Sequence, residues 1–185
     1  MDCLNRAIDL IDEEKTDEKI ALQFDIVQVW LDSENFTLAA GEAKSIADNS
    51  PGYKRNGNAI WLYYYALSRA NNVKTILANI DTAIADPRCS DYRAKLMYMK
   101  WWALRRQKDK TAQIAALEHE LIREYGNDPI VAPVMLSRAT DILAGQDHAG
   151  AFTLFEQLQE KFPSTKAAEQ AKKIAEKLKK LQGLK

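Results

Sequence analysis

The side chains that could perform catalysis or hold a metal are few and scattered. The chain has two histidines, and His119-Glu120 is not followed by the second histidine that a zinc-protease motif requires. Cys3 and Cys89 lack the Cys-x-x-Cys spacing of a zinc or redox site. The seven glycines form neither a phosphate-binding loop nor a nucleophile elbow. The sequence therefore predicts a protein that is not an enzyme and that holds no metal and no cofactor.

Aromatic side chains gather instead in two segments near the middle of the chain, 57–70 and 90–106. If both segments are helical, successive side chains turn by about 100°, and each helix can be divided into two faces. On 57–70 we expect a core face and an opposite face. The core face would carry Ile60, Tyr63, Ala66, Leu67 and Ala70, and the opposite face Trp61, Tyr64, Tyr65 and Ser68.

The segment 90–106 divides in the same way. Its apolar side would carry Ala94, Met97, Trp101 and Leu104, and the other side Asp91, Lys95, Tyr98, Trp102, Arg105 and Arg106. The aromatic residues either fill gaps between neighbouring helices or line a groove, and Trp, Tyr and Arg are typical of binding hot spots. The candidate partner-binding residues are Trp61, Tyr64, Tyr65, Lys95, Tyr98, Trp102, Arg105 and Arg106.

Charge around this segment indicates the kind of partner. Residues 88–110 contain eight basic side chains, with only Asp91 and Asp109 as acids. Such a region could bind an acidic peptide, or could stack a single-stranded nucleic acid. The whole chain has 26 basic and 26 acidic residues, so no general field favours nucleic acid or an anionic membrane. We therefore expect a protein or an acidic peptide as the partner, and we consider nucleic acid the weaker alternative.

The elements that must position these side chains follow from the breaks in the sequence. Four prolines, at 51, 87, 129 and 163, lie 36, 42 and 34 residues apart, which is the spacing of helical-hairpin repeats. A weaker polar break divides each interval in two. This pattern predicts hairpin units over about 17–50, 55–87, 90–128 and 130–163.

Each unit then contains two helices, and one further helix lies at each end of the chain. First helices are expected near 17–32, 57–70, 90–106 and 131–144, and second helices near 35–48, 73–85, 111–125 and 148–161. A lead-in helix would cover about 3–14. A capping helix would cover 165–181, with Ser164 or Thr165 as its N-cap and a lysine-rich outer face.

The fourth unit resembles a tetratricopeptide repeat (TPR). Ala139 stands in its first helix, Ala151 and Phe155 in its second, and Phe162-Pro163 closes it. The first unit is similar, and the end of the fourth also resembles the final repeat of bacterial cell-envelope proteins of this family. The resemblance implies a superhelical scaffold that binds a partner on its concave face without catalysis of its own.

Composition agrees with an all-α fold. Ala and Leu are abundant, Val and Thr are scarce, and the chain has only seven glycines and five prolines. We therefore predict a single all-α domain over 1–185, a TPR-like α-solenoid of about four hairpins with a lead-in and a capping helix. No apolar run approaches the length of a membrane span, so we expect a soluble protein.

A second hypothesis is a structural subunit or a homo-oligomer of a larger assembly. Residues 1–20 carry seven acids against three bases, whereas residues 161–185 carry eight lysines against two glutamates. Opposite charges at the two ends could favour head-to-tail association, although charge alone gives little specificity. The cytoplasm is slightly favoured as the compartment, and the periplasm is the alternative if a signal segment has been removed.

Overall fold

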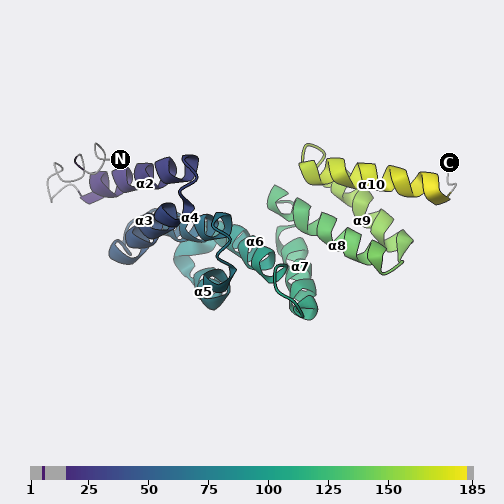
Figure 1. The fold of residues 1–185 in the computed structure, drawn as a ribbon, viewed down its shortest axis with the longest axis horizontal. Helices are drawn as coiled ribbons and strands as arrows, with labels where there is room; N and C mark the ends of the chain where they lie inside the picture. The colour runs from purple at the N-terminus through teal and green to yellow at the C-terminus, as the bar shows by residue number, and fades with distance from the viewer. Residues whose placement is uncertain (1–5, 7–15, 183–185) are drawn as a thin grey trace. The chain divides into compact units, whose positions relative to one another are not determined.

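The computed structural model describes residue 6 and residues 16–182, and every regular element in that part of the chain is helical (Figure 1). The all-α class is thereby confirmed, whereas the predicted lead-in helix at 3–14 falls almost wholly outside the described residues. The chain divides into two compact units, Met1–Gln107 and Lys108–Lys185, and each is described by itself. The third predicted hairpin, 90–128, contributes one helix to each unit.

The first unit is a succession of helices in which neighbours along the chain pack together. The elements are α2 (Thr16–Asp32), α3 (Phe36–Asn49), α4 (Asn56–Arg69), α5 (Val73–Ala85), the 3₁₀ helix η1 (Pro87–Tyr92) and α6 (Arg93–Leu104). Helix α4 contacts α3, α5, α6 and η1, so it is the most extensively covered helix of this unit.

Polar caps and turns place the boundaries of these helices. The side chain of Asn72 accepts a hydrogen bond from the backbone N–H of Thr75 at the start of α5 (3.3 Å). Asp86 likewise accepts from the N–H of Arg88 (2.9 Å), and Pro87 follows it as the first residue of η1. This capped 3₁₀ turn explains why α6 begins at Arg93 and not at the predicted residue 90.

The second unit contains the helices α7 (Thr111–Tyr125), α8 (Ala132–Ala144), α9 (His148–Lys161) and α10 (Lys166–Gln182), with the 3₁₀ helix η2 (Pro129–Val131) before α8. Helix α8 packs on α9, and α10 packs on both. The predicted capping helix is confirmed as a helix, and Thr165 caps it by accepting from the N–H of Ala168 (3.2 Å).

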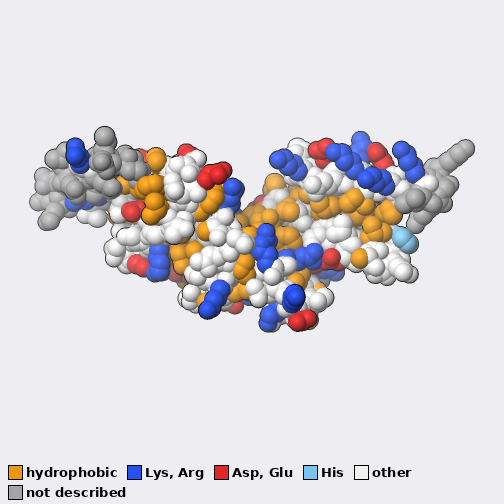
Figure 2. All heavy atoms as spheres, viewed as in Figure 1, with side chains coloured by type: hydrophobic (Ala, Val, Ile, Leu, Met, Phe, Trp, Pro, Cys, Tyr) orange, Lys and Arg blue, Asp and Glu red, His pale blue; other side chains and the backbone are white. Residues whose placement is uncertain are grey.

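Helix α10 is strongly two-sided. Its buried side consists of Ala167, Ala168, Ala171 and Ala175. Its lysines remain exposed, and Figure 2 shows them along the outer edge of the helix. Small alanine side chains allow α10 to lie close to α9 and α8, while the lysine face stays in water.

Two clusters of buried side chains flank α4 and form the core of the first unit. One cluster joins α2, α3 and α4 through Val27, Ile46 and Ala59. The other joins α3, α4, α5, η1 and α6, and it includes Ile80 and Leu96. Because α4 is covered on both flanks, only a narrow part of its circumference is left for solvent or a partner.

This coverage corrects the predicted division of α4 into two faces. Tyr64 and Ser68, expected on the open face, are buried, whereas Tyr63 is half-buried and Ala70 is exposed. Tyr64 instead packs in the cluster that contains Ile76, Ile80 and Cys89. The division of α6 was correct for its apolar side, since Ala94, Met97, Trp101 and Leu104 are all buried.

The burial of Tyr64 gives the protein a stability that depends on pH in the alkaline range. Burial raises the pKa of Tyr64 from 10.0 to about 12. A phenol whose pKa is raised on folding stabilises the native state below pH 10, and this contribution is lost as the pH rises toward 12. We expect the free energy of unfolding of the wild type to fall by about 2 kcal/mol more than that of Tyr64→Phe between these two pH values.

Urea unfolding of both proteins at several pH values measures this difference. The buried Cys89, whose pKa burial raises to about 11, is present in both proteins and cancels in the comparison. Parallel pH profiles for the two proteins would show that Tyr64 ionises as freely in the native state as in the unfolded chain.

Candidate functional site

The aromatic side chains of α4, η1 and α6 meet in one stacked group, which we call the Trp61 surface: Trp61, Tyr65, Tyr92 and Lys95. The Trp61 ring stacks on Tyr65 with a centroid distance of 5.6 Å and an interplanar angle of 28°. It also stacks on Tyr92, at 5.8 Å and 16°. All four residues are half-buried, so their rings pack together and still reach the surface.

Lys95 adds a positive charge to these rings. Its Nζ lies 4.4 Å from the centroid of the Trp61 ring and 5.3 Å from that of Tyr92, within the range of cation–π attraction. Over the part of the chain that the structure describes, no carboxylate forms an ion pair with Lys95. The Trp61 surface therefore presents an ammonium group that aromatic faces hold in place and that no acid of these residues neutralises.

The Trp61 ring is itself fixed by its surroundings. Its Nε1 is buried and makes no hydrogen bond within the described residues. A buried N–H without an acceptor costs free energy, so the stacking of the ring must outweigh this cost. The rings of Tyr65 and Tyr92, which both stack on Trp61, provide that contact.

A hollow of about 350 Å³ adjoins Trp61 on the side of α2. Apolar and charged groups share its wall, with the guanidinium of Arg69 lying 4.9 Å from the centroid of the Phe36 ring. The side chains that line it are Gln28, Leu31, Asp32, Glu34, Phe36, Trp61, Leu62, Tyr65 and Arg69. Trp61 and Tyr65 belong both to this hollow and to the Trp61 surface, so the two form one continuous site.

A second aromatic group lies further along α6. The guanidinium of Arg106 lies 3.6 Å from the centroid of the Trp102 ring, and its Nη1 donates to the Trp102 carbonyl (3.2 Å). The rings of Tyr98 and Trp101 approach to 5.4 Å. Tyr98 and Trp102 are half-buried, and Arg105 and Arg106 are exposed.

The structure thus brings together some of the predicted partner-binding residues and separates others. Trp61, Tyr65 and Lys95 meet in the Trp61 surface, while Tyr98, Trp102, Arg105 and Arg106 follow on α6. Tyr64 does not join them, because it turns into the core between α4 and α5.

Tyr92 is the residue of the Trp61 surface that the sequence prediction missed. It was placed in a helix that was expected to begin at residue 90, but it ends the 3₁₀ turn before α6. Tyr92 precedes Lys95 by three residues, and side chains at that spacing lie on the same side of a helical segment. This spacing could have identified Tyr92 from the sequence.

Other kinds of site receive no support from the residues described. Among residues 6 and 16–182, no group of three or more His, Cys, Asp or Glu side chains is placed to hold a metal ion. None of the helices described is both long and apolar enough to cross a membrane. No protein-family model matches this chain, and the curated proteins contain no significant match to it.

Trp101 and Trp102 are adjacent in α6. Alanine substitutions at the two positions test the assignment of Trp101 to the core and of Trp102 to the surface. Trp101 is 7% exposed, whereas Trp102 is half-buried. We expect Trp101→Ala to lower the free energy of unfolding by about 3–5 kcal/mol, since it empties a core position. Trp102→Ala should cost at least about 2 kcal/mol less. Equal losses in urea unfolding would show that Trp102 is as much a packing residue as Trp101.

Proposed function

We propose that this protein is a non-catalytic scaffold of TPR-like helical hairpins that binds an acidic segment of a partner protein at the Trp61 surface. One observation carries the proposal: Lys95 lies over the rings of Trp61 and Tyr92 and has no carboxylate partner in the described part of the chain.

The arrangement of the helices supports a repeat scaffold. The observed helices agree with the predicted ones to within three residues at either end, and the prolines between the predicted hairpins lie 36, 42 and 34 residues apart, a spacing typical of helical-hairpin repeats. The Trp61 surface and its hollow are built mainly from α2, α4 and α6, the first helices of the predicted hairpins. The resemblance to the TPR family implies a concave face that binds a partner, and we propose that the Trp61 surface belongs to that face.

The chemistry of the surface favours an acidic segment with an apolar side chain. The ammonium group of Lys95 provides N–H donors for a carboxylate, and a charge-assisted hydrogen bond is about twice as strong as a neutral one. The stacked rings provide flat apolar area at little cost in conformational entropy. Tryptophan and tyrosine are among the residue types typical of binding hot spots.

The hollow beside Trp61 makes a nucleic acid a less suitable ligand. Asp32 and Glu34 both line it, and their carboxylates would repel a phosphate backbone that passed over Trp61. The same carboxylates repel an acidic peptide, but a peptide can place its acidic group at Lys95 and only an apolar side chain in the hollow, whereas a nucleic acid carries a charge at every phosphate.

Lys95→Met and Lys100→Met form a matched pair for testing this proposal. Both lysines belong to α6, but the Nζ of Lys100 pairs with Asp81 (2.6 Å), away from the aromatic rings. Binding is measured by fluorescence polarisation with labelled peptides drawn from a random-sequence library and grouped by charge. We expect acidic peptides to bind, Lys95→Met to weaken them about fivefold or more, and Lys100→Met to leave them unchanged.

Two outcomes would contradict the proposal. In the first, acidic peptides of the library bind no better than neutral or basic peptides. In the second, Lys95→Met and Lys100→Met weaken the binding of acidic peptides equally, which would indicate a general effect of net charge. Thermal melts of the variants establish that each is folded before binding is compared.

A further inference from the structure

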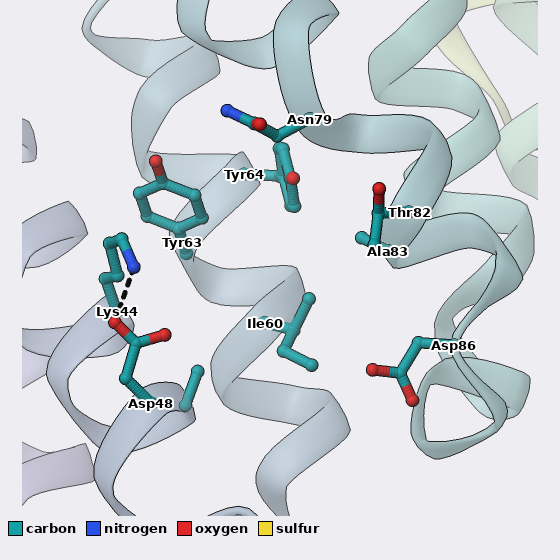
Figure 3. Close-up of a pocket in the computed structure, with 10 residues that line it drawn as sticks. Lys44, Asp48, Ile60, Tyr63, Tyr64, Asn79, Thr82, Ala83 and Asp86 are labelled. Atoms are coloured by element: carbon teal, nitrogen blue, oxygen red, sulfur yellow. Dashed lines mark hydrogen bonds and ion pairs between the residues drawn. The ribbon is translucent and has the colours of Figure 1, made fainter.

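A second pocket, on the other side of α4, has a different chemistry. Its volume is about 380 Å³, within the range of small-molecule sites, and residues of α3, α4 and α5 line it (Figure 3). Ala47, Ile60 and Ala83 provide apolar contact. The polar lining residues are Lys44, Asp48, Tyr63, Tyr64, Asn79, Thr82 and Asp86.

The charged groups of this pocket are already paired. The Nζ of Lys44 lies 2.5 Å from Oδ2 of Asp48. Asp86 binds the guanidinium of Arg88 (2.5 Å), and this hydrogen bond holds the pKa of the Asp86 carboxyl below its usual value. A charged ligand would have to compete with these partners, so the pocket suits an uncharged molecule.

The neutral polar groups are not paired. Among the described residues, the hydroxyls of Tyr63, Tyr64 and Thr82 and the amide of Asn79 make no hydrogen bond. Tyr64 is only 4% exposed, so the pocket that it lines is where its hydroxyl can meet a partner. Hydroxyls and carboxamides both donate and accept hydrogen bonds, as the hydroxyls of a sugar do.

The rings add a surface on which a flat ligand can stack. In Figure 3 the Tyr63 ring is seen face-on and the Tyr64 ring edge-on, and Asn79 lies above both in the view. The two rings meet at 5.0 Å with an interplanar angle of 63°, which fixes the orientation of both. A sugar ring has an apolar C–H side for an aromatic face and hydroxyls at its rim for Asn79 and Thr82.

We propose that the pocket between α3, α4 and α5 binds an uncharged saccharide of one or two rings. The saccharide stacks on Tyr63 and forms hydrogen bonds with the Tyr64 hydroxyl and the Asn79 amide. Among the described residues Asp48 accepts only at Oδ2, from Lys44, so its remaining lone pairs can accept from a further sugar hydroxyl. The site shares no residue with the Trp61 surface or its hollow, so separate variants can test the two.

The experiment is an NMR titration of the ¹⁵N-labelled protein with glucose, galactose, N-acetylglucosamine, maltose and cellobiose. We expect at least one of these sugars to give saturable shifts at Ile60, Tyr64 and Thr82. Tyr64→Phe removes one hydroxyl and should weaken that sugar at least about fivefold. Tyr65→Phe, the same change at the next residue of α4 and outside the pocket, should leave its affinity unchanged.

Asn79→Ala provides a second test at an exposed position, where loss of folding is not expected. It should also weaken the sugar at least about fivefold. The proposal is overturned if no sugar of the panel gives saturable shifts in the pocket, or if Tyr64→Phe and Asn79→Ala bind it as the wild type does. Saturable binding of the neutral amide N-acetylalanine methylamide with no sugar binding would assign the pocket to a peptide backbone and likewise overturn the proposal.

Discussion

The backbone of α4 lies directly against the backbone of η1 at Gly57, and the first unit depends on this approach. A Cβ atom at Gly57 would lie 1.9 Å from the carbonyl oxygen of Arg88. Only glycine permits such a distance, and the obstacle is backbone that Asp86 and Pro87 hold in a capped 3₁₀ turn. The start of α4 is thus fixed relative to η1, the segment that leads into α6.

The position of α4 determines what each of its sides can do. With η1 against its first turn, Trp61 stacks on Tyr92 and comes under Lys95. The next turn directs Tyr64 toward α5, where its ring is buried and its hydroxyl meets a pocket. One helix therefore contributes to a charged aromatic surface and to an uncharged polar pocket, and we assign a peptide to the first and a saccharide to the second.

The sequence predicted the helices well because their boundaries depend on local chemistry. Asn72, Asp86 and Thr165 cap the segments that they precede, and local hydrogen bonds of this kind act whatever the tertiary fold. The buried side of α6 was equally predictable, since Met97, Trp101 and Leu104 follow one apolar stripe.

The faces of α4 were harder to predict, for a physical reason. Periodicity assigns a single buried side to a helix, whereas α4 is covered by α3 on one flank and by α5, η1 and α6 on others. Tyr64 is buried in a cluster whose other members include Ile80, Cys89 and Leu96, which are distant from it in sequence. The role of Gly57 was hidden as well, because a glycine in a sequence does not reveal which backbone approaches it.

The most direct test of this account is the stability of Gly57→Ala compared with that of Gly41→Ala. Gly41 lies in α3 with no atom near the site of an added Cβ, so alanine there should stabilise the protein by about 1 kcal/mol through helix propensity. At Gly57 the same propensity is opposed by the Arg88 carbonyl, and we expect a net loss of about 2 kcal/mol or more in urea unfolding. A Gly57→Ala protein as stable as Gly41→Ala would mean that α4 does not approach η1 in this way, and the stacking of Trp61 on Tyr92 would lose its basis.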